Sequence, residues 1–325
     1  MRIHADSARS VLSVAAVLCL TGPAIAQETP MSELVIYGLD GDYGMNGEGG
    51  APGRLFRFHP GAGAYQVIGD TYLAGTSVPL WDWESLAYIP DGPSKGAYSV
   101  PLDDQSGSPR QKLIQISMFD ATGTVVGSAD LGNVRGLTPV KIGGEWKLQA
   151  IRTQGNTSRL FVIDPATGAP EGAEFLVDTD PGAGQSSVRL FGLAFDAVGA
   201  LLAVSHEGDQ SRIWQIDPSN GAAASLGPAA NAPRVEALEV AVGNAVPAFS
   251  GLPAATLGWP FDRGVLMGFA DDNATMYIFN PLNGAAEPLT SIEGNPIAVP
   301  WTDVEGIVFL TEAQDPGTYV FDGCD

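Results

Sequence analysis

The chain has 325 residues, of which 45% are hydrophobic and 16% are charged, and it contains 41 glycines and 24 prolines. Glycine and proline make up a fifth of the chain, which excludes a mainly helical protein because each costs about 1 to 3 kcal/mol in a helix interior. The net charge of −21 attracts cations and repels nucleic acid and anionic membranes. We therefore expect an all-β protein with many turns and no nucleic-acid partner.

The N-terminus has the three parts of an export signal. Arg2 and Arg9 form a basic start, and an apolar stretch over 11–20 precedes an Ala-Ile-Ala cleavage motif. This stretch is too short to cross a membrane, and no later segment reaches the roughly 18 residues that a span requires. We expect a signal peptide over residues 1–26 and one secreted or periplasmic domain over residues 27–325, monomeric and without a membrane span.

One short phrase recurs along the chain and predicts a β-hairpin. It consists of a β-branched and aromatic run, an Asp-Pro or Asn-Pro step and a glycine. The run favours a strand, the Asp or Asn side chain bonds the backbone of its own turn, proline fixes φ, and glycine takes the left-handed position. The copies lie at 160–168, 213–221 and 276–284, with weaker copies at 55–63 and 116–123, where His59 and Asp120 take the Asp position.

Two further elements recur between these hairpins, so that each repeat has four strands. The first opens the repeat and is found at 83–87, 134–138, 190–194, 235–239 and 304–308. The second is an apolar strand at 96–100, 146–151, 200–204 and 265–269. Tandem four-stranded units of about 40 to 60 residues are typical of a β-propeller. The alternative, a β-sandwich, does not produce this period.

The copies also predict the number of blades and the closure of the ring. There are five opening strands and five hairpins, but the order begins with a hairpin and ends with the opening strand 304–308. That strand can complete the blade that the strands at 34–39, 54–59 and 64–68 begin. We expect a propeller of five four-stranded blades, closed by strands from both ends of the chain, and residues 318–321 leave a sixth blade open.

Propeller topology brings candidate site residues to one end of the central channel. The opening strands line the channel, and the loops that follow the second strands lie at the end where the opening strands begin. The second residues of the opening strands are Glu84, Arg135, Phe191, Glu236 and Glu305. The loops after the second strands add Asp103, Asp104, His206, Glu207, Asp209, Asp271 and Asp272.

Carboxylates dominate this set. Glu236, Glu305 and Glu84 lie in three consecutive blades once the ring closes. Three converging carboxylates cannot all stay ionised without a cation or a basic partner, and oxygen ligands are those that Ca²⁺ and Mg²⁺ prefer. We predict a divalent cation, Ca²⁺, on these glutamates, with Arg135 and the aspartates of the two Asp-Asp loops contacting a small ligand. The alternative is that the glutamates are ordinary solvated residues of an acidic protein.

His206 and Glu207 are candidate catalytic residues on the same face. A histidine at a metal site can act as a general base or as a ligand; otherwise His206 is a polar loop residue. Trp81, Trp83 and Trp301 lie near the starts of two opening strands. They form a stacking platform for a sugar ring or pack between blades.

The repeats resemble those of secreted bacterial propellers whose blades contain A-F-D-x-x-G and I-D-P-x-x-G elements, best seen in this chain over 193–221. Within 303–307, Asp-Val-Glu-Gly-Ile is similar to the D-x-E-G-I element of phytase-like propellers with proposed esterase activity. The Glu-Gly step also resembles that of gluconolactonase-type propellers, and this resemblance implies that Glu305 is a metal ligand.

These features are consistent with two classes of function. The first is an exported propeller that binds a divalent cation or a small ligand at an acidic mouth, without catalysis or as a sensor. The alternative is a metal-dependent hydrolase of an ester, lactone or phosphoester, in which carboxylates hold the metal and His206 or a glutamate acts as the base.

Overall fold

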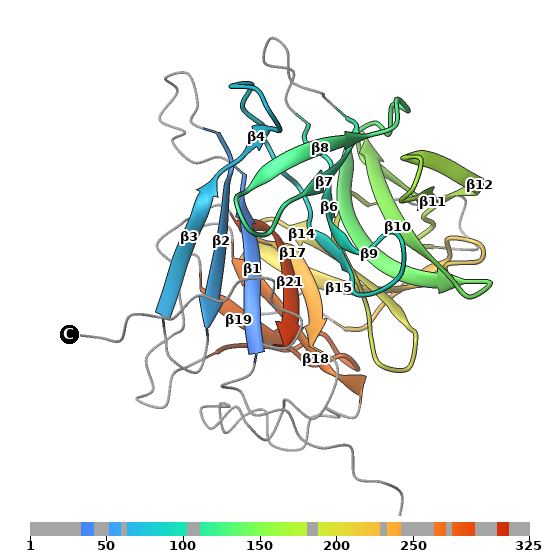
Figure 1. Ribbon diagram of the computed structural model, residues 1–325. Helices are drawn as coiled ribbons and strands as arrows, with labels where there is room; N and C mark the ends of the chain where they lie inside the picture. The colour runs from blue at the N-terminus through green and yellow to red at the C-terminus, as the bar shows by residue number, and fades with distance from the viewer. Residues whose placement is uncertain are drawn as a thin grey trace, which may run out of the picture.

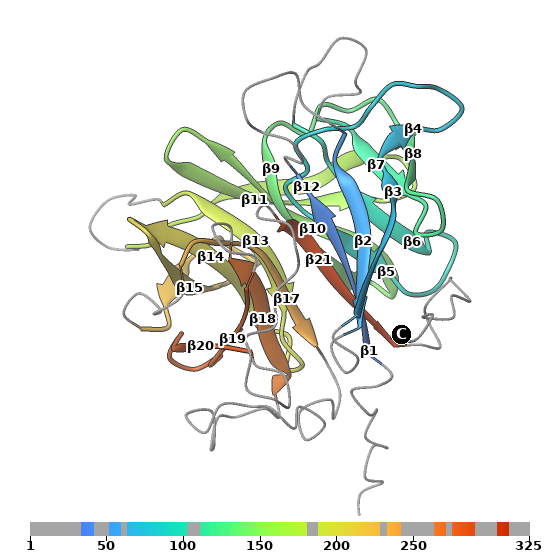
Figure 2. The same ribbon diagram turned by 90° about the vertical axis from the view of Figure 1, so that its left-hand side faces the viewer.

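A computed structural model describes residues 34–41, 52–59, 64–102, 111–180, 188–227, 233–241, 263–270, 275–289 and 304–311. These residues form 21 strands in five sheets (Figures 1 and 2). The fold is all-β, and it is the five-bladed propeller that the repeats predict. No helix in the described ranges has the length and apolar character needed to cross a membrane.

Each blade is one sheet, and its strands follow one another from the channel outwards. Blade 1 contains β21 (Val304–Thr311), β1 (Leu34–Asp40), β2 (Arg54–His59) and β3 (Ala64–Asp70). Blade 2 contains β5 (Ala87–Ile89), β6 (Gly96–Ser99), β7 (Leu113–Ile116), β8 (Thr122–Val126) and the parallel strand β4 (Tyr72–Leu73).

Blade 3 contains β9 (Val134–Ile142), β10 (Glu145–Gln154), β11 (Thr157–Asp164) and β12 (Ala169–Leu176). Blade 4 contains β13 (Leu190–Phe195), β14 (Leu201–Glu207), β15 (Gln210–Ile216) and β16 (Ala223–Ser225), and blade 5 contains β17 (Val235–Ala241), β18 (Val265–Ala270), β19 (Met276–Phe279) and β20 (Ala286–Pro288).

Strands from the two ends of the described chain close the ring. β21 pairs antiparallel with β1, with Val35 opposite Leu310 and Tyr37 opposite Val308, and both views show the red β21 beside the blue β1. The inner strands β5, β9, β13, β17 and β21 each contact the next inner strand around the ring, including β21 with β5. The predicted closure is therefore confirmed.

The hydrophobic core is divided into five clusters, each between two neighbouring blades. Between blades 1 and 2, for example, Tyr37 and Leu55 pack with Trp83 and Ile114. Trp83 is fully buried, and its Nε1 donates to Thr71 Oγ1 at 2.9 Å. Trp83 therefore packs between blades and offers no stacking platform at the mouth.

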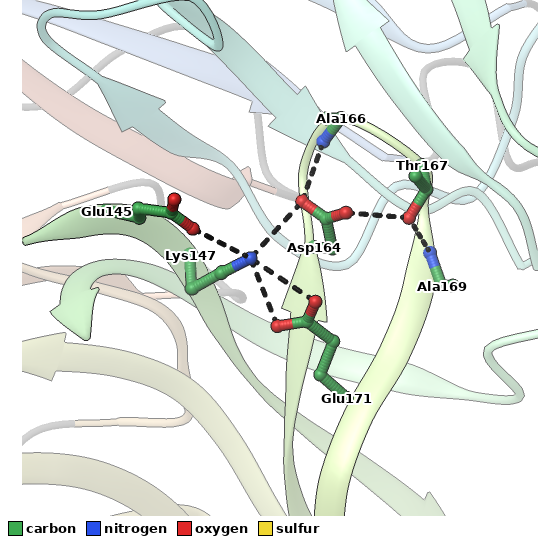
Figure 3. Close-up of polar contacts among 7 residues, drawn as sticks. All are labelled: Glu145, Lys147, Asp164, Ala166, Thr167, Ala169 and Glu171. Atoms are coloured by element: carbon green, nitrogen blue, oxygen red, sulfur yellow. Dashed lines mark hydrogen bonds and ion pairs between the residues drawn. The ribbon is translucent and has the colours of Figure 1, made fainter. Parts of the chain in front are cut away.

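The Asp-Pro hairpins fold as the repeat predicts. In blade 3 the Thr167 hydroxyl donates to Asp164 Oδ2 at 2.9 Å, and the Gly168 N–H donates to the Asp164 carbonyl at 2.8 Å, with φ +67° at Gly168. Lys147 lies beside the Asp164 carboxylate and joins it to Glu171 (Figure 3). These turns lie at the end of the blades opposite the candidate site, which agrees with a structural role.

Blade 2 differs from the prediction in two places. Its hairpin turn begins at Ser117 and not at Asp120, because the Ala121 N–H donates to the Ser117 carbonyl at 2.9 Å and Ala121 takes the left-handed φ of +61°. The predicted alignment of this copy is wrong, since a serine and an alanine replace the Asp and Gly that mark the other turns. The inner strand also begins later than predicted, at Ala87, and Trp83 makes only an isolated bridge.

Candidate functional site

Three glutamates from three consecutive blades meet at one end of the channel. Glu236 lies on β17, Glu305 on β21, and Glu84 just before β5. One carboxylate oxygen of each lies within 4.8 Å of the other two, and Glu84, Glu236 and Glu305 are only 2%, 6% and 7% exposed. The predicted convergence of this glutamate triad is confirmed, and its burial separates these residues from ordinary solvated glutamates.

β-Bulges explain how these side chains meet. Arg135, Glu236 and Glu305 are each the extra residue of a bulge in an inner strand. In β9, for example, the pairing passes from Gly136 to Val134 and leaves Arg135 without a residue opposite. A bulge bends its strand and re-aims the added side chain, so these residues leave the usual alternation between the two faces of a blade.

Each blade contributes one equivalent residue to the mouth, and these five ring positions are Glu84, Arg135, Phe191, Glu236 and Glu305. The residue after each ring position is small, which lets the inner strands approach closely. These residues are Ser85, Gly136, Gly192, Ala237 and Gly306. A Cβ at Gly136 would lie 2.9 Å from the carbonyl carbon of Gly192, and a Cβ at Gly192 would lie 2.7 Å from the carbonyl oxygen of Glu236. The cavity between the strands measures about 10 Å³, enough for roughly one water molecule. The narrow channel brings the carboxylates together.

The charge of Glu84 depends on burial and on one arginine. Burial raises the pKa of Glu84 well above its usual value, Arg135 lowers it, and the negative charges of Asp82 and Glu236 raise it again. Arg135 contacts Glu84 Oε1 through Nη1. Glu84 Oε2 is buried without a hydrogen-bond partner among the described residues. Because a buried acceptor without a donor costs about 1 to 3 kcal/mol or more when charged, a cation at this oxygen would be stabilising.

Two arginines that the sequence analysis did not single out lie beside the triad. Arg189 and Arg234 each precede a ring residue by two positions. Arg234 Nη2 lies 3.0 Å from Glu236 Oε1, and the Arg189 guanidinium lies 4.9 Å from the centroid of the Phe191 ring. Both arginines directly precede the inner strand of their blade, and this position is the sequence signal that they offer.

His206 contacts this cluster through Phe191 and Arg234. Its imidazole stacks on Phe191 with ring centroids 4.2 Å apart. Nδ1 accepts a hydrogen bond from Arg234 Nε at 3.3 Å, and Nε2 lies 3.0 Å from the Val235 carbonyl oxygen, which places the proton of the neutral ring on Nε2. Burial lowers the pKa of His206. Nδ1 also lies 3.7 Å from Glu236 Oε1.

The remaining candidates lie away from the triad or outside the described residues. Glu207 is half-exposed and accepts a hydrogen bond from Arg212 Nη2 at 2.7 Å. Five of the predicted site residues lie outside the described ranges, and these are Asp103, Asp104, Asp271, Asp272 and Trp301. The described part of the mouth is thus less acidic than expected, because three arginines accompany its three glutamates.

Comparisons with known proteins give distant structural likenesses. No protein-family model and no curated protein matches the chain. It is similar to the structure of a candidate 6-phosphogluconolactonase from Bacteroides fragilis, with 16% identity, 79% of this chain and 66% of that one covered, and a TM-score of 0.34. It is also similar to TolB from Acinetobacter baumannii, with 13% identity, 79% of this chain and 53% of that one covered, and a TM-score of 0.43. A protein of unknown function from Bacteroides caccae has 10% identity, with 86% of this chain and 99% of that one covered, and a TM-score of 0.40. The chain therefore spans less than two thirds of the first two proteins, and the likeness is one of fold.

Proposed function

We propose that this protein is an exported propeller that binds a divalent cation, Ca²⁺, at Glu84, Glu236 and Glu305, and holds a small ligand at the same mouth without catalysis. The observation that carries the proposal is the approach of three buried carboxylates to within 4.8 Å, one of which has an oxygen without a donor. Export rests on the signal-like residues 1–26, so N-terminal sequencing of exported protein should begin near residue 27.

Without a cation the triad is electrostatically incomplete. Carboxylates this close disfavour one another's ionisation. Arg135 contacts Glu84 and Arg234 pairs with Glu236, but each of these ion pairs involves only one of the three carboxylates. A divalent cation can contact all three carboxylates at once and offsets two of their three negative charges. Carboxylate oxygens match Ca²⁺ and Mg²⁺ better than they match soft transition metals, and Ca²⁺ takes six to eight oxygens, which leaves positions for water or a ligand.

Calcium titration of the purified protein tests the proposal. Isothermal titration and elemental analysis should find bound Ca²⁺, and thermal melting should show stabilisation by about 2.7 kcal/mol at a hundredfold excess over Kd. EDTA should reverse the effect. The triple variant Glu84→Gln, Glu236→Gln, Glu305→Gln should lose the response, whereas Glu145→Gln, which changes an exposed glutamate on β10, should keep it. A melting curve indifferent to EDTA and millimolar Ca²⁺ would refute the proposal.

A metal-dependent hydrolase is the second candidate, and the neutral imidazole of His206 near Glu236 favours it. Such a ring can accept a proton, but Nδ1 must first release the hydrogen bond from Arg234. Assays with p-nitrophenyl acetate, p-nitrophenyl phosphate and gluconolactone, with and without Ca²⁺, test this function. Calcium-dependent turnover that His206→Gln abolishes, while Ca²⁺ binding persists, would support the hydrolase; no turnover above buffer would reject it.

A further inference from the structure

We propose that the mouth holds an anion site beside the glutamate triad, in which Arg189 and Arg234 bind the carboxylate or phosphate group of a small molecule. When a cation binds Glu84 in place of Arg135, the guanidinium of Arg135 becomes available and joins this anion site. The inference rests on the proposed function, because it names the chemical class of the ligand that the mouth would hold next to the cation.

Basic residues are scarce in this chain, yet three gather at the mouth. The protein has 16 lysines and arginines against 37 acidic residues. Burial lowers the pKa of Arg189, the charges of Arg135 and Arg234 lower it further, and Glu84 and Glu236 raise it. Arg135 and Arg189 both lie against the Phe191 ring, with Cζ 5.8 and 4.9 Å from its centroid, so their like charges repel. An anion between them would relieve that repulsion.

Arg189 has the donors that such an anion needs. Within the described part of the chain its guanidinium makes no hydrogen bond or ion pair, and its close contact is with the Phe191 ring. Arg135 also lies over Phe191, with Cζ 5.8 Å from the ring centroid. The planar donor fork of arginine matches carboxylate and phosphate oxygens. Phe191 thus lies beside two guanidinium groups at the only ring position that carries an uncharged side chain.

His206 orients the second arginine of the site. The ring of His206 is held between the face of Phe191 and the Val235 carbonyl. Its Nδ1 accepts from Arg234 Nε, while Nη2 of the same guanidinium pairs with Glu236. The Arg234 side chain is nevertheless 40% exposed. Because a guanidinium carries five N–H donors, this oriented and accessible group can contact an anion that enters from solvent.

Cation binding and anion binding should strengthen each other. Arg135 is paired with Glu84. A divalent cation on the triad adds two positive charges and competes with Arg135 for Glu84, which frees guanidinium donors for the anion. Because such coupling is reciprocal, the anion should raise the cation affinity by the same factor, typically about 5- to 150-fold.

Isothermal titration with phenylphosphate and benzoate tests this inference, with benzyl alcohol as an uncharged probe of similar size. We expect either anion to bind at least about fivefold more tightly to Ca²⁺-loaded protein than to protein in EDTA, and benzyl alcohol not to bind. Arg189→Gln and Arg234→Gln should each weaken anion binding roughly tenfold or more and retain Ca²⁺ binding. Lys141→Gln removes one positive charge from an exposed residue of β9 and should leave the anion affinity unchanged.

Three results would overturn the inference. The first is an anion affinity that is the same in the wild type and both arginine variants, and the second is equal binding of benzyl alcohol. The third, in protein that binds Ca²⁺ in the absence of anions, is an anion affinity that does not depend on Ca²⁺, which removes the coupling. Failure of the proposed function looks different: Ca²⁺ would not bind in the absence of anions, while arginine-dependent binding of phenylphosphate or benzoate in EDTA would persist.

Discussion

Arg135 of blade 3 contacts the carboxylate of Glu84 in blade 2, and this ion pair joins two inner strands at the mouth. Both side chains are largely buried, with exposed fractions of 14% and 2%. Removing one partner of a buried pair leaves a charge without compensation and costs about 3 to 5 kcal/mol. Arg135 is therefore the counter-charge of Glu84 and a competitor of any cation that binds there.

Arg135→Gln should destabilise the metal-free protein and tighten Ca²⁺ binding. We expect a loss of about 1 to 3 kcal/mol, less than for a carboxylate that stays charged, because Glu84 can take up a proton. Urea unfolding in EDTA and calorimetric Ca²⁺ titration measure the two effects. Lys141→Gln breaks an exposed pair with Asp91 and should cost at most about 1 kcal/mol. Weaker Ca²⁺ binding in the Arg135 variant would contradict competition.

Gly136→Ala should widen the channel and weaken the triad. Its Cβ would lie 2.9 Å from the Gly192 carbonyl carbon, and overpacking of this kind costs about 1 to 3 kcal/mol. In Gly69→Ala the nearest atom would be 3.5 Å away, so this variant should melt close to the wild type. Thermal melting and Ca²⁺ titration of both variants check the expectation. Equal melting temperatures would show that the inner strands can separate at no cost.

Gly168→Ala should destabilise the protein more than Gly172→Ala does. The two glycines have φ of +67° and +70°, so the backbone strain of an alanine is nearly the same at both. A Cβ at Gly168 would overlap the Val126 carbonyl of blade 2, whereas a Cβ at Gly172 would meet nothing within 4 Å. We expect a difference of about 1 kcal/mol or more in the free energy of unfolding. Equal losses would leave φ alone as the reason for glycine at both positions.

The hairpin phrase predicts most of the fold because each of its residues has a local task. The side chains of Asp164, Asp217 and Asn280 each accept the backbone N–H two residues on, and their carbonyl oxygens accept the N–H of the glycine four residues on. The prediction fails in blade 2, where Ser117 and Ala121 form the same turn. A serine can replace the aspartate, and an alanine can take a left-handed φ at a small energetic cost, so that turn leaves no recognisable phrase.

The site is predictable only where ring closure decides it. Closure makes the blades of Glu236, Glu305 and Glu84 neighbours. Their equivalent positions near the start of the inner strands then place all three side chains at the same end of the channel. The β-bulges could not be predicted, because a bulge depends on the partner strand as well as on the residue that it adds. Arg189 and Arg234 lie two positions before the ring residues, and an arginine before a strand is common enough that spacing alone does not single it out.

The pH dependence of stability tests a carboxyl group outside the triad, that of the partly buried Glu239. Glu239 lies on β17 opposite Met267 of β18, and its carboxylate accepts a hydrogen bond from the Val240 N–H at 2.9 Å. Burial raises the pKa of Glu239 from 4.5 to about 8, and the hydrogen bond from Val240 lowers it. The group is thus protonated in the folded protein at pH values where the unfolded chain has already lost the proton.

Glu239→Gln should therefore remove a part of the pH dependence of stability. The folded state binds this proton more tightly than the unfolded state does, so the contribution of Glu239 is fully present below about pH 4.5 and is lost as the pH rises towards about 8. Urea unfolding of the wild type and the variant at pH 5, 6.5 and 8, with EDTA present to exclude cations from the triad, isolates this contribution. The wild type should lose stability relative to Glu239→Gln at each step upwards, whereas the exposed Glu145→Gln should track the wild type. A wild-type to Glu239→Gln difference that stays constant from pH 5 to 8 would mean that the Glu239 carboxylate is already ionised in the folded protein at pH 5.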